Sequence, residues 1–126
     1  MNTILLIENN NAILDNLTEL FELEGYHILI ASNGLQGIEL ARIFIPDLII
    51  CDILMAKMDG LEVLHSILQT ACTNKIPFIF STCMSEKNDK IIALKAGADD
   101  YIVKPYNPEI LLAMAKKWIL SGTKRL

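Results

Sequence analysis

Polar residues stand directly after several apolar runs of this sequence. Asp52 follows the continuous run Leu48–Cys51, and the other polar residues in this position are Glu8, Asn9, Thr82 and Lys104. A buried carboxylate without a partner is costly, so Asp52 needs a counter-charge, an opening to water or a metal ion. Together these groups could hold Mg²⁺ and a phosphate oxygen, or support phosphoryl chemistry with Asp52 as the nucleophile.

The apolar runs alternate with segments of helical period. They have the length and the branched residues of strands, and they are Ile4–Ile7, His27–Ala31, Leu48–Cys51, Phe78–Ser81 and Tyr101–Val103. Because they are continuously apolar, they indicate strands buried on both faces, as in a parallel sheet covered by helices. Five such units are too few for a closed eight-stranded barrel. We therefore predict an α/β fold with an open, doubly wound sheet.

Helix start signals stand between the runs. The candidate capping residues are Asn10 or Asn11, Ser32 and Asn33, Asp59, Ser85 and Asn107. Asp59 is followed three residues later by Glu62, which forms a capping-box variant. This cap explains Asp59 without any part in a functional site, and both interpretations of Asp59 remain open.

The residues that follow the strands should meet at one edge of the sheet. In open α/β sheets, ligands bind beyond the carboxyl ends of the strands. Asp52, Thr82 and Lys104 follow three different strands and converge there. A purely structural explanation would require three independent strand ends to carry reactive groups by coincidence, so we favour a functional site.

Composition limits the classes of protein that this chain can be. Its 126 residues fit one domain, which we place at residues 1–121 with a C-terminal tail at 122–126. The net charge is −4 and the Lys and Arg residues are spread along the chain, which argues against direct nucleic-acid binding. No membrane span or signal peptide is evident, and three cysteines without metal-ligand spacing suggest buried, reduced thiols. We expect a cytoplasmic protein.

The chain resembles a response-regulator receiver domain, of the chemotaxis-regulator kind, over essentially its whole length. The motifs that carry the resemblance are LLIEN with Glu8, IICDILMAKMDG with Asp52, Asp59 and Gly60, FSTC with Thr82, and AGADDYIVKP with Tyr101, Lys104 and Pro105. The resemblance implies a flavodoxin-like (βα)5 sandwich with strand order 2-1-3-4-5. In such a domain Asp59, Gly60 and Pro105 are structural residues at the site.

The resemblance also implies a phosphorylation chemistry. Asp52 would accept a phosphoryl group from a histidine kinase or a histidine phosphotransfer protein of a two-component phosphorelay. Mg²⁺ would be held by Asp52, by the acidic corner at Glu8 and Asn9, and by the main-chain carbonyl of Leu54. Lys104 would pair with the phosphoryl oxygens, and its peptide bond to the following proline is cis in the family.

A conformational switch is implied as well. Thr82 would move to hydrogen-bond the phosphoryl group and draw Tyr101 inward, which would remodel the face formed by the fourth helix, the fifth strand and the fifth helix. A downstream protein or a second copy of the chain would bind that face. The alternative for Tyr101 is an aromatic residue that packs on its strand with the hydroxyl in water.

Three residues depart from the family pattern. The usual second acid after the first strand is Asn9 here, so we expect weaker Mg²⁺ binding. Leu54 and Met84 flank the path of the hydrolytic water and cannot orient it, so we expect a long-lived phosphoryl-aspartate.

The leading functional hypothesis is a phosphoacceptor signalling switch that is no enzyme beyond self-phosphorylation and slow autodephosphorylation. The alternative is a pseudo-receiver, a protein-binding module independent of phosphorylation, and Asn9 favours it. A phosphohydrolase would need an acid at Leu54, and a flavodoxin-like flavin carrier would need a glycine-rich loop after the first strand. A stand-alone protein and a fragment of a longer regulator both remain open.

Overall fold

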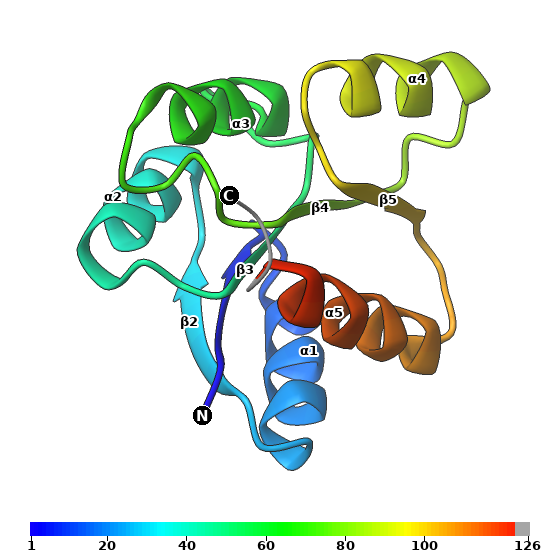
Figure 1. The fold of residues 1–126 in the computed structure, drawn as a ribbon. Coiled ribbons are helices and arrows are strands. Elements are labelled where there is room, and N and C mark those ends of the chain that lie inside the picture. The colour runs from blue at the N-terminus through cyan, green and yellow to red at the C-terminus, as the bar shows by residue number, and fades with distance from the viewer. Residues whose placement is uncertain (123–126) are drawn as a thin grey trace.

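Five parallel strands form one sheet in the order β2-β1-β3-β4-β5, as predicted (Figure 1). The computed structural model describes residues 1–122. The strands are β1 Thr3–Ile7, β2 His27–Ala31, β3 Leu48–Cys51, β4 Phe78–Thr82 and β5 Asp100–Val103. The helices are α1 Asn11–Leu23, α2 Gly34–Phe44, α3 Gly60–Gln69, α4 Lys87–Lys95 and α5 Pro108–Gly122. The doubly wound, flavodoxin-like architecture is confirmed.

The two faces of the sheet are covered by different helices. Alternate strand residues point to opposite faces, so Leu5 and Ile7 of β1 belong to the core under α2, α3 and α4. Ile4 and Leu6 belong to the core under α1 and α5. Burial on both faces explains the continuously apolar segments of β1, β3 and β4. The expectation is wrong for β2, an edge strand in which His27 and Ile30 are exposed.

Most of the predicted helix caps are confirmed. The side chains of Asn10 and Asn33 accept hydrogen bonds from the third residue of their helices, and Asp59 forms the capping box with Glu62. The fourth helix is the exception, because Glu86 and not Ser85 is its N-cap residue. Asp89 accepts a hydrogen bond from the Glu86 main-chain N–H, which places the start of α4 one residue later.

The expectation of three buried thiols is wrong for two of them. Cys51 lies in the core, but Cys72 and Cys83 are exposed. Both exposed cysteines lie outside regular secondary structure, so the apolar character of their residue type does not decide their burial.

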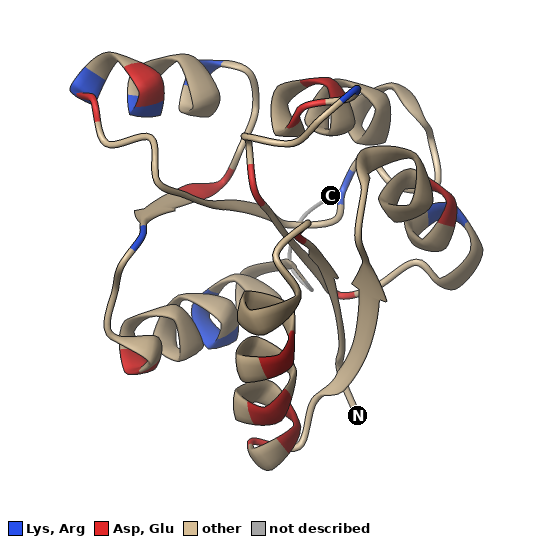
Figure 2. Ribbon diagram, turned by 180° about the vertical axis from the view of Figure 1, so that it is seen from behind, with Lys and Arg blue, Asp and Glu red and all other residues tan. Residues whose placement is uncertain are grey.

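Charged residues are distributed over several elements. Figure 2 shows Lys and Arg on different helices and loops and not on a single face. Within residues 1–122, no helix combines the length and the apolar character needed to cross a membrane. Of the predicted tail 122–126, Gly122 is the last residue of α5, and residues 123–126 lie outside the described part.

Candidate functional site

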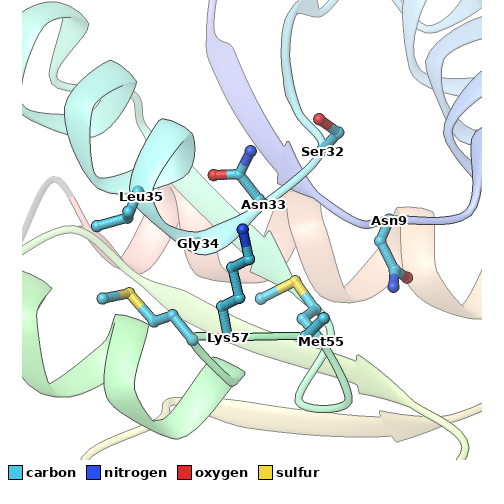
Figure 3. A pocket seen from close by; sticks show the side chains of 9 residues that line it. Asn9, Ser32, Asn33, Gly34, Leu35, Met55 and Lys57 are labelled. Carbon is cyan, nitrogen blue, oxygen red and sulfur yellow. The ribbon is translucent and has the colours of Figure 1, made fainter.

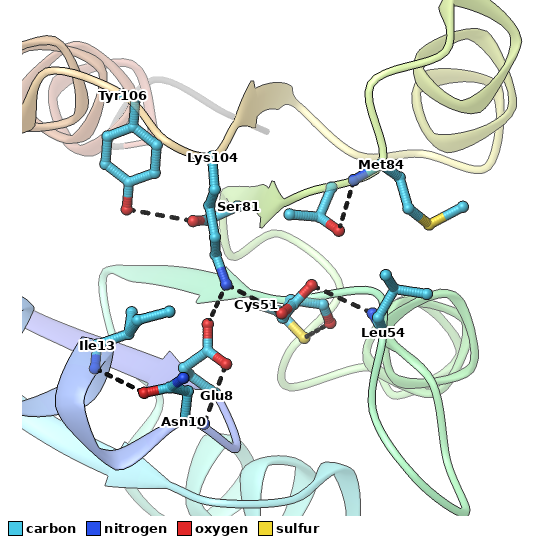
Figure 4. Close-up of polar contacts among 11 residues, drawn as sticks. Glu8, Asn10, Ile13, Cys51, Leu54, Ser81, Met84, Lys104 and Tyr106 are labelled. Carbon is cyan, nitrogen blue, oxygen red and sulfur yellow. Dashed lines mark hydrogen bonds and ion pairs between the residues drawn. The ribbon is translucent and has the colours of Figure 1, made fainter.

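One ammonium group joins two buried acids at the carboxyl edge of the sheet. Lys104 Nζ donates to Glu8 Oε1 and, at 3.0 Å, to Asp52 Oδ2 (Figure 4). Glu8 and Asp52 are only 5% and 7% exposed. Since buried carboxylates are costly without a partner, the Lys104 ammonium supplies the partner that both acids need.

Strand register brings these groups together. Ile7 and Cys51 are partners in the parallel pairing of β1 with β3, so Glu8 and Asp52 follow adjacent strands at the same level. In the pairing of β4 with β5, Thr82 is the partner of Val103, the residue that precedes Lys104. The predicted convergence of the strand ends is therefore present for the two acids, the hydroxyl and the ammonium.

The environment changes the pKa of Lys104. Burial alone would lower the pKa of this ammonium, but the hydrogen bonds to Glu8 and Asp52 outweigh burial and hold the pKa above its ordinary value. At neutral pH Lys104 is therefore fully protonated. The pKa of the neighbouring Cys51 thiol is also raised, first by burial and then by the charge of Asp52. The thiol therefore stays protonated, and it donates a hydrogen bond to the Asp52 carbonyl.

The second oxygen of the Asp52 carboxylate faces the loop that leads to α3. Asp52 Oδ1 accepts a hydrogen bond of 3.1 Å from the Leu54 main-chain N–H. The same loop returns close to Asp52 at Gly60, where a Cβ atom would lie 2.3 Å from the Asp52 carbonyl oxygen. Gly60 thus allows the close approach of α3 to the acid. Asp59 caps α3 and forms no hydrogen bond with Asp52 within residues 1–122, so the capping interpretation accounts for it.

Thr82 and Tyr101 both bind the main chain of Met84. Thr82 is fully buried and its Oγ1 accepts from the Met84 N–H at 3.4 Å, while the Tyr101 hydroxyl donates to the Met84 carbonyl at 2.7 Å. Burial, followed by the charges of Asp89 and Asp52, raises the pKa of Tyr101, so its hydroxyl remains a donor. The alternative that placed this hydroxyl in water is wrong.

The loop after β5 contacts the end of β4 through two hydroxyl groups. The Lys104–Pro105 peptide bond is cis, as the resemblance implied. The next residue, Tyr106, lies with its hydroxyl 3.2 Å from Ser81 Oγ. Sequence reasoning missed this contact, although a serine at the end of β4 and a tyrosine after Pro105 were both visible in the sequence.

Asn9 stands apart from the acids. It is exposed and lines a neighbouring pocket together with Ser32 and Met55 (Figure 3). Within residues 1–122, no three His, Cys, Asp or Glu side chains gather closely enough to hold a metal ion. Glu8 and Asp52 converge on one cationic group, and carboxylate oxygens of this kind are ligands that suit a divalent cation.

Fold and site together define a flavodoxin-like domain whose sheet edge carries an acid–lysine cluster. The model of the response regulator receiver domain family matches residues 4–116. The chain therefore belongs to this family, whose members are the receiver domains of two-component response regulators.

Known relatives agree with this membership. The chain is 35% identical over 113 residues to the transcriptional regulatory protein CpxR of Escherichia coli strain K12, which covers 90% of this chain and 47% of CpxR. It spans about half the length of the curated relatives that it matches. A CheY-like response regulator receiver domain protein from Methanospirillum hungatei JF-1 has a TM-score of 0.91 and 30% identity, and the match covers 98% of both chains.

One structural neighbour contains a metal ion. The receiver domain of the sensor histidine kinase PA1611 from Pseudomonas aeruginosa PAO1 has a magnesium ion coordinated in its active site cleft. Its TM-score is 0.86 at 25% identity, over 94% of this chain and 98% of that one.

Replacement of Lys104 tests the charge balance of the site. Lys104→Met would leave two buried acids without a cation and should lower the free energy of unfolding at neutral pH by about 3 kcal/mol. Because the pKa of Lys104 is raised in the folded protein, its contribution is complete below the ordinary lysine pKa of about 10.4 and is lost as pH rises through the folded-state pKa.

The measurement is urea unfolding of the wild type and the variant at a series of pH values from neutral to strongly alkaline. The difference between the two proteins should stay constant up to about pH 10 and shrink above it. Lys116→Met on the exposed side of α5 is the control and should change stability by less than about 0.5 kcal/mol. A Lys104→Met difference that does not vary with pH would contradict this account.

Proposed function

We propose that the protein is a phosphoacceptor switch of a two-component phosphorelay. An Asp52 carboxylate oxygen attacks the phosphorus of a phosphohistidine on a histidine kinase or phosphotransfer protein. The P–N bond breaks, the imidazole leaves with a proton, and an acyl phosphate forms on Asp52. The observation that carries the proposal is the Lys104 ammonium 3.0 Å from Asp52 Oδ2, because a cation at this place can neutralise incoming phosphoryl oxygens.

The residues around Asp52 each have a part in this proposal. Glu8, Asn9, Asp52 and the main chain of Leu54 would hold Mg²⁺, which supplies positive charge to the phosphoryl oxygens when bound. Lys104 would exchange its bond with Asp52 for bonds to the phosphoryl group. Pro105, Asp59 and Gly60 would keep the two loops in place, and the α3 cap and the close approach to Asp52 support this for Asp59 and Gly60.

The proposed output begins at Thr82. Its hydroxyl accepts only a long bond from the Met84 N–H, so it can turn to donate to a phosphoryl oxygen at small cost. Tyr101 holds the carbonyl of the same residue, and a shift at Thr82 would therefore reach Tyr101 through Met84. The helix that follows, α4, buries only Ala93 and exposes Ile91 and Ile92, which suits an element that is remodelled and then bound by a partner.

The output partner in this proposal is a protein. A downstream protein or a second copy of the chain would bind the face formed by α4, β5 and α5, with no direct contact to nucleic acid or membrane. The domain would comprise residues 1–121, act in the cytoplasm, and catalyse only its own phosphorylation and slow dephosphorylation. The transcriptional regulators among the relatives are longer proteins, so their output activities are not carried over to this chain.

A pseudo-receiver is the second candidate. Two observations favour it: Asn9 adds no charge to the acidic corner, and Lys104 already forms ion pairs with both acids. In that case the face of α4, β5 and α5 would bind its partner without phosphorylation.

Phosphorylation separates the two candidates. Incubation of the protein with Mg²⁺ and acetyl phosphate should add one phosphoryl group, detected by intact mass, and Asp52→Asn should abolish the addition. Asp59→Asn is the matched control, because it removes a nearby acid while an asparagine can still cap α3. Absence of any mass gain in the wild type, with the fold intact by circular dichroism, would leave the pseudo-receiver.

The charge at position 9 should control Mg²⁺ affinity. Asn9→Asp adds a carboxylate beside Glu8, and one further charge at an effective dielectric of about 20 should tighten binding about tenfold or more. The measurement is an Mg²⁺ titration followed through the amide resonances of Glu8 and Asp52. Asn10→Asp changes the net charge equally but keeps the α1 cap, and it should have a much smaller effect. Equal effects of the two variants would contradict a direct role of position 9.

The lifetime of the phosphoryl group should depend on Leu54 and Met84. Leu54 is 50% exposed at the mouth of the site and Met84 is partly buried beside it, and neither side chain can orient a water molecule. Leu54→Asn and Met84→Glu should each shorten the half-life of the phosphorylated protein, by about tenfold, in a phosphate-release assay. Half-lives that are unchanged or longer in both variants would refute this role.

A further inference from the structure

The main chain around Lys104 is attached to the end of β4 at two points. On the N-terminal side, the Lys104 N–H donates to the Thr82 carbonyl at 2.8 Å. On the C-terminal side, the Tyr106 hydroxyl lies 3.2 Å from Ser81 Oγ (Figure 4). Ser81 and Thr82 are neighbours whose side chains point to opposite faces of the sheet. The end of β4 therefore holds the chain before and after the Lys104 side chain.

The second attachment point has no substitute in this loop. Pro105 has no N–H group to donate, and Asn107 accepts hydrogen bonds from the first residues of α5. Within the described residues 1–122, the contact between Tyr106 and Ser81 is thus the one hydrogen bond that ties residues 105–107 to the sheet. Without this bond, the main chain beyond Lys104 could move away from β4.

Both hydroxyl groups of this pair depend on each other. Ser81 is 3% exposed, and the core on its face of the sheet contains the apolar neighbours Ile79 and Ile102. A buried hydroxyl without a partner is costly, so the pair stabilises the position of both side chains. Burial raises the pKa of Tyr106 more than the bond to Ser81 and the charge of Lys104 lower it, so the hydroxyl stays protonated.

The position of the main chain matters because one side chain must reach two acids. The Lys104 ammonium contacts Glu8 after β1 and, at 3.0 Å, Asp52 after β3. Such bonds extend to only about 3.2 Å, so a small shift of the loop would break one of them. The flexible stem of a lysine does not by itself fix where the ammonium lies. A fixed main chain is therefore needed for the ammonium to be shared.

We propose that Tyr106 is a positioning residue for Lys104. Its hydroxyl, through Ser81, fixes the loop after β5, and the fixed loop holds the ammonium where it bonds both Glu8 and Asp52. This role concerns contacts within the folded protein. Its consequence for phosphoryl transfer, in which the ammonium receives phosphoryl oxygens, rests on the function proposed above.

The ammonium protons of Lys104 report on this role. They are observed by ¹H–¹⁵N NMR of the lysine ammonium groups in the full chain, without Mg²⁺ and at mildly acidic pH, and the Lys104 signal is identified by its absence in Lys104→Arg. Protons held in ion pairs exchange slowly with water, and those of the exposed Lys116 exchange fast. Tyr106→Phe keeps the ring and removes the hydroxyl, and it should speed the exchange at Lys104 at least about threefold.

A double-variant cycle separates positioning from a general loss of stability. Ser81→Ala should speed the exchange at Lys104 by about the same factor as Tyr106→Phe, and the double variant should be no faster than either, because both changes remove one bond. Tyr26→Phe is the matched control. Tyr26 packs against the same core, its hydroxyl forms no hydrogen bond within residues 1–122, and its replacement should leave the exchange unchanged.

The consequence for phosphoryl transfer is measured separately. With acetyl phosphate and saturating Mg²⁺, Tyr106→Phe should lower the maximal rate of phosphorylation at least about threefold, and Tyr26→Phe should not change it. Equal rates in Tyr106→Phe and a wild type that is phosphorylated would contradict this consequence. A wild type that takes up no phosphoryl group would refute the proposed function, and the exchange measurement would still decide the role of Tyr106.

Three results would overturn the positioning role. The first is a wild-type Lys104 ammonium that exchanges as fast as that of Lys116. The second is equal exchange in Tyr106→Phe and the wild type. The third is a double variant in which the effects of Ser81→Ala and Tyr106→Phe multiply, because the two hydroxyls would then act independently.

Discussion

The contact of the Lys104 ammonium with the Glu8 and Asp52 carboxylates is the interaction on which the site depends. Two acids could not be buried side by side in charged form without a cation between them. The same contact joins the residues that follow β1, β3 and β5, so it ties the end of the edge strand β5 to the centre of the sheet. A cation that enters the site must compete with this ammonium for the acids, whereas an anionic group would compete with the acids for the ammonium.

The surroundings of Asp52 differ in how tightly they are packed. On one side, Gly60 brings α3 so close that a single Cβ atom would meet the Asp52 main chain. On the other side, the loop from Thr82 to α4 is held through the main chain of Met84, and α4 itself buries only Ala93. The α3 side of the acid is therefore closely packed, and the α4 side has few buried contacts.

Exposure divides the mouth of the site into two chemical regions. Around Asp52 the groups are buried, and the two carboxylates share the Lys104 ammonium. Around Asn9 the surface opens into a cavity that Lys57 also lines (Figure 3). The Lys57 ammonium forms no ion pair within residues 1–122. Asn9 lines this second region, and within residues 1–122 its side chain forms no hydrogen bond with Glu8 or Asp52.

The sequence by itself determined the fold and the identity of the strand-end residues. Continuous apolar strands and helix caps such as Asn33 and Asp59 are local signals, because hydrophobic period and capping act between neighbours in the chain. It could not reveal that Lys104 bonds both acids, that the Tyr101 hydroxyl meets the Met84 carbonyl, or that the Tyr106 hydroxyl meets Ser81. These contacts join residues from different units of the chain, and only the packed sheet and its register bring their side chains to the same place.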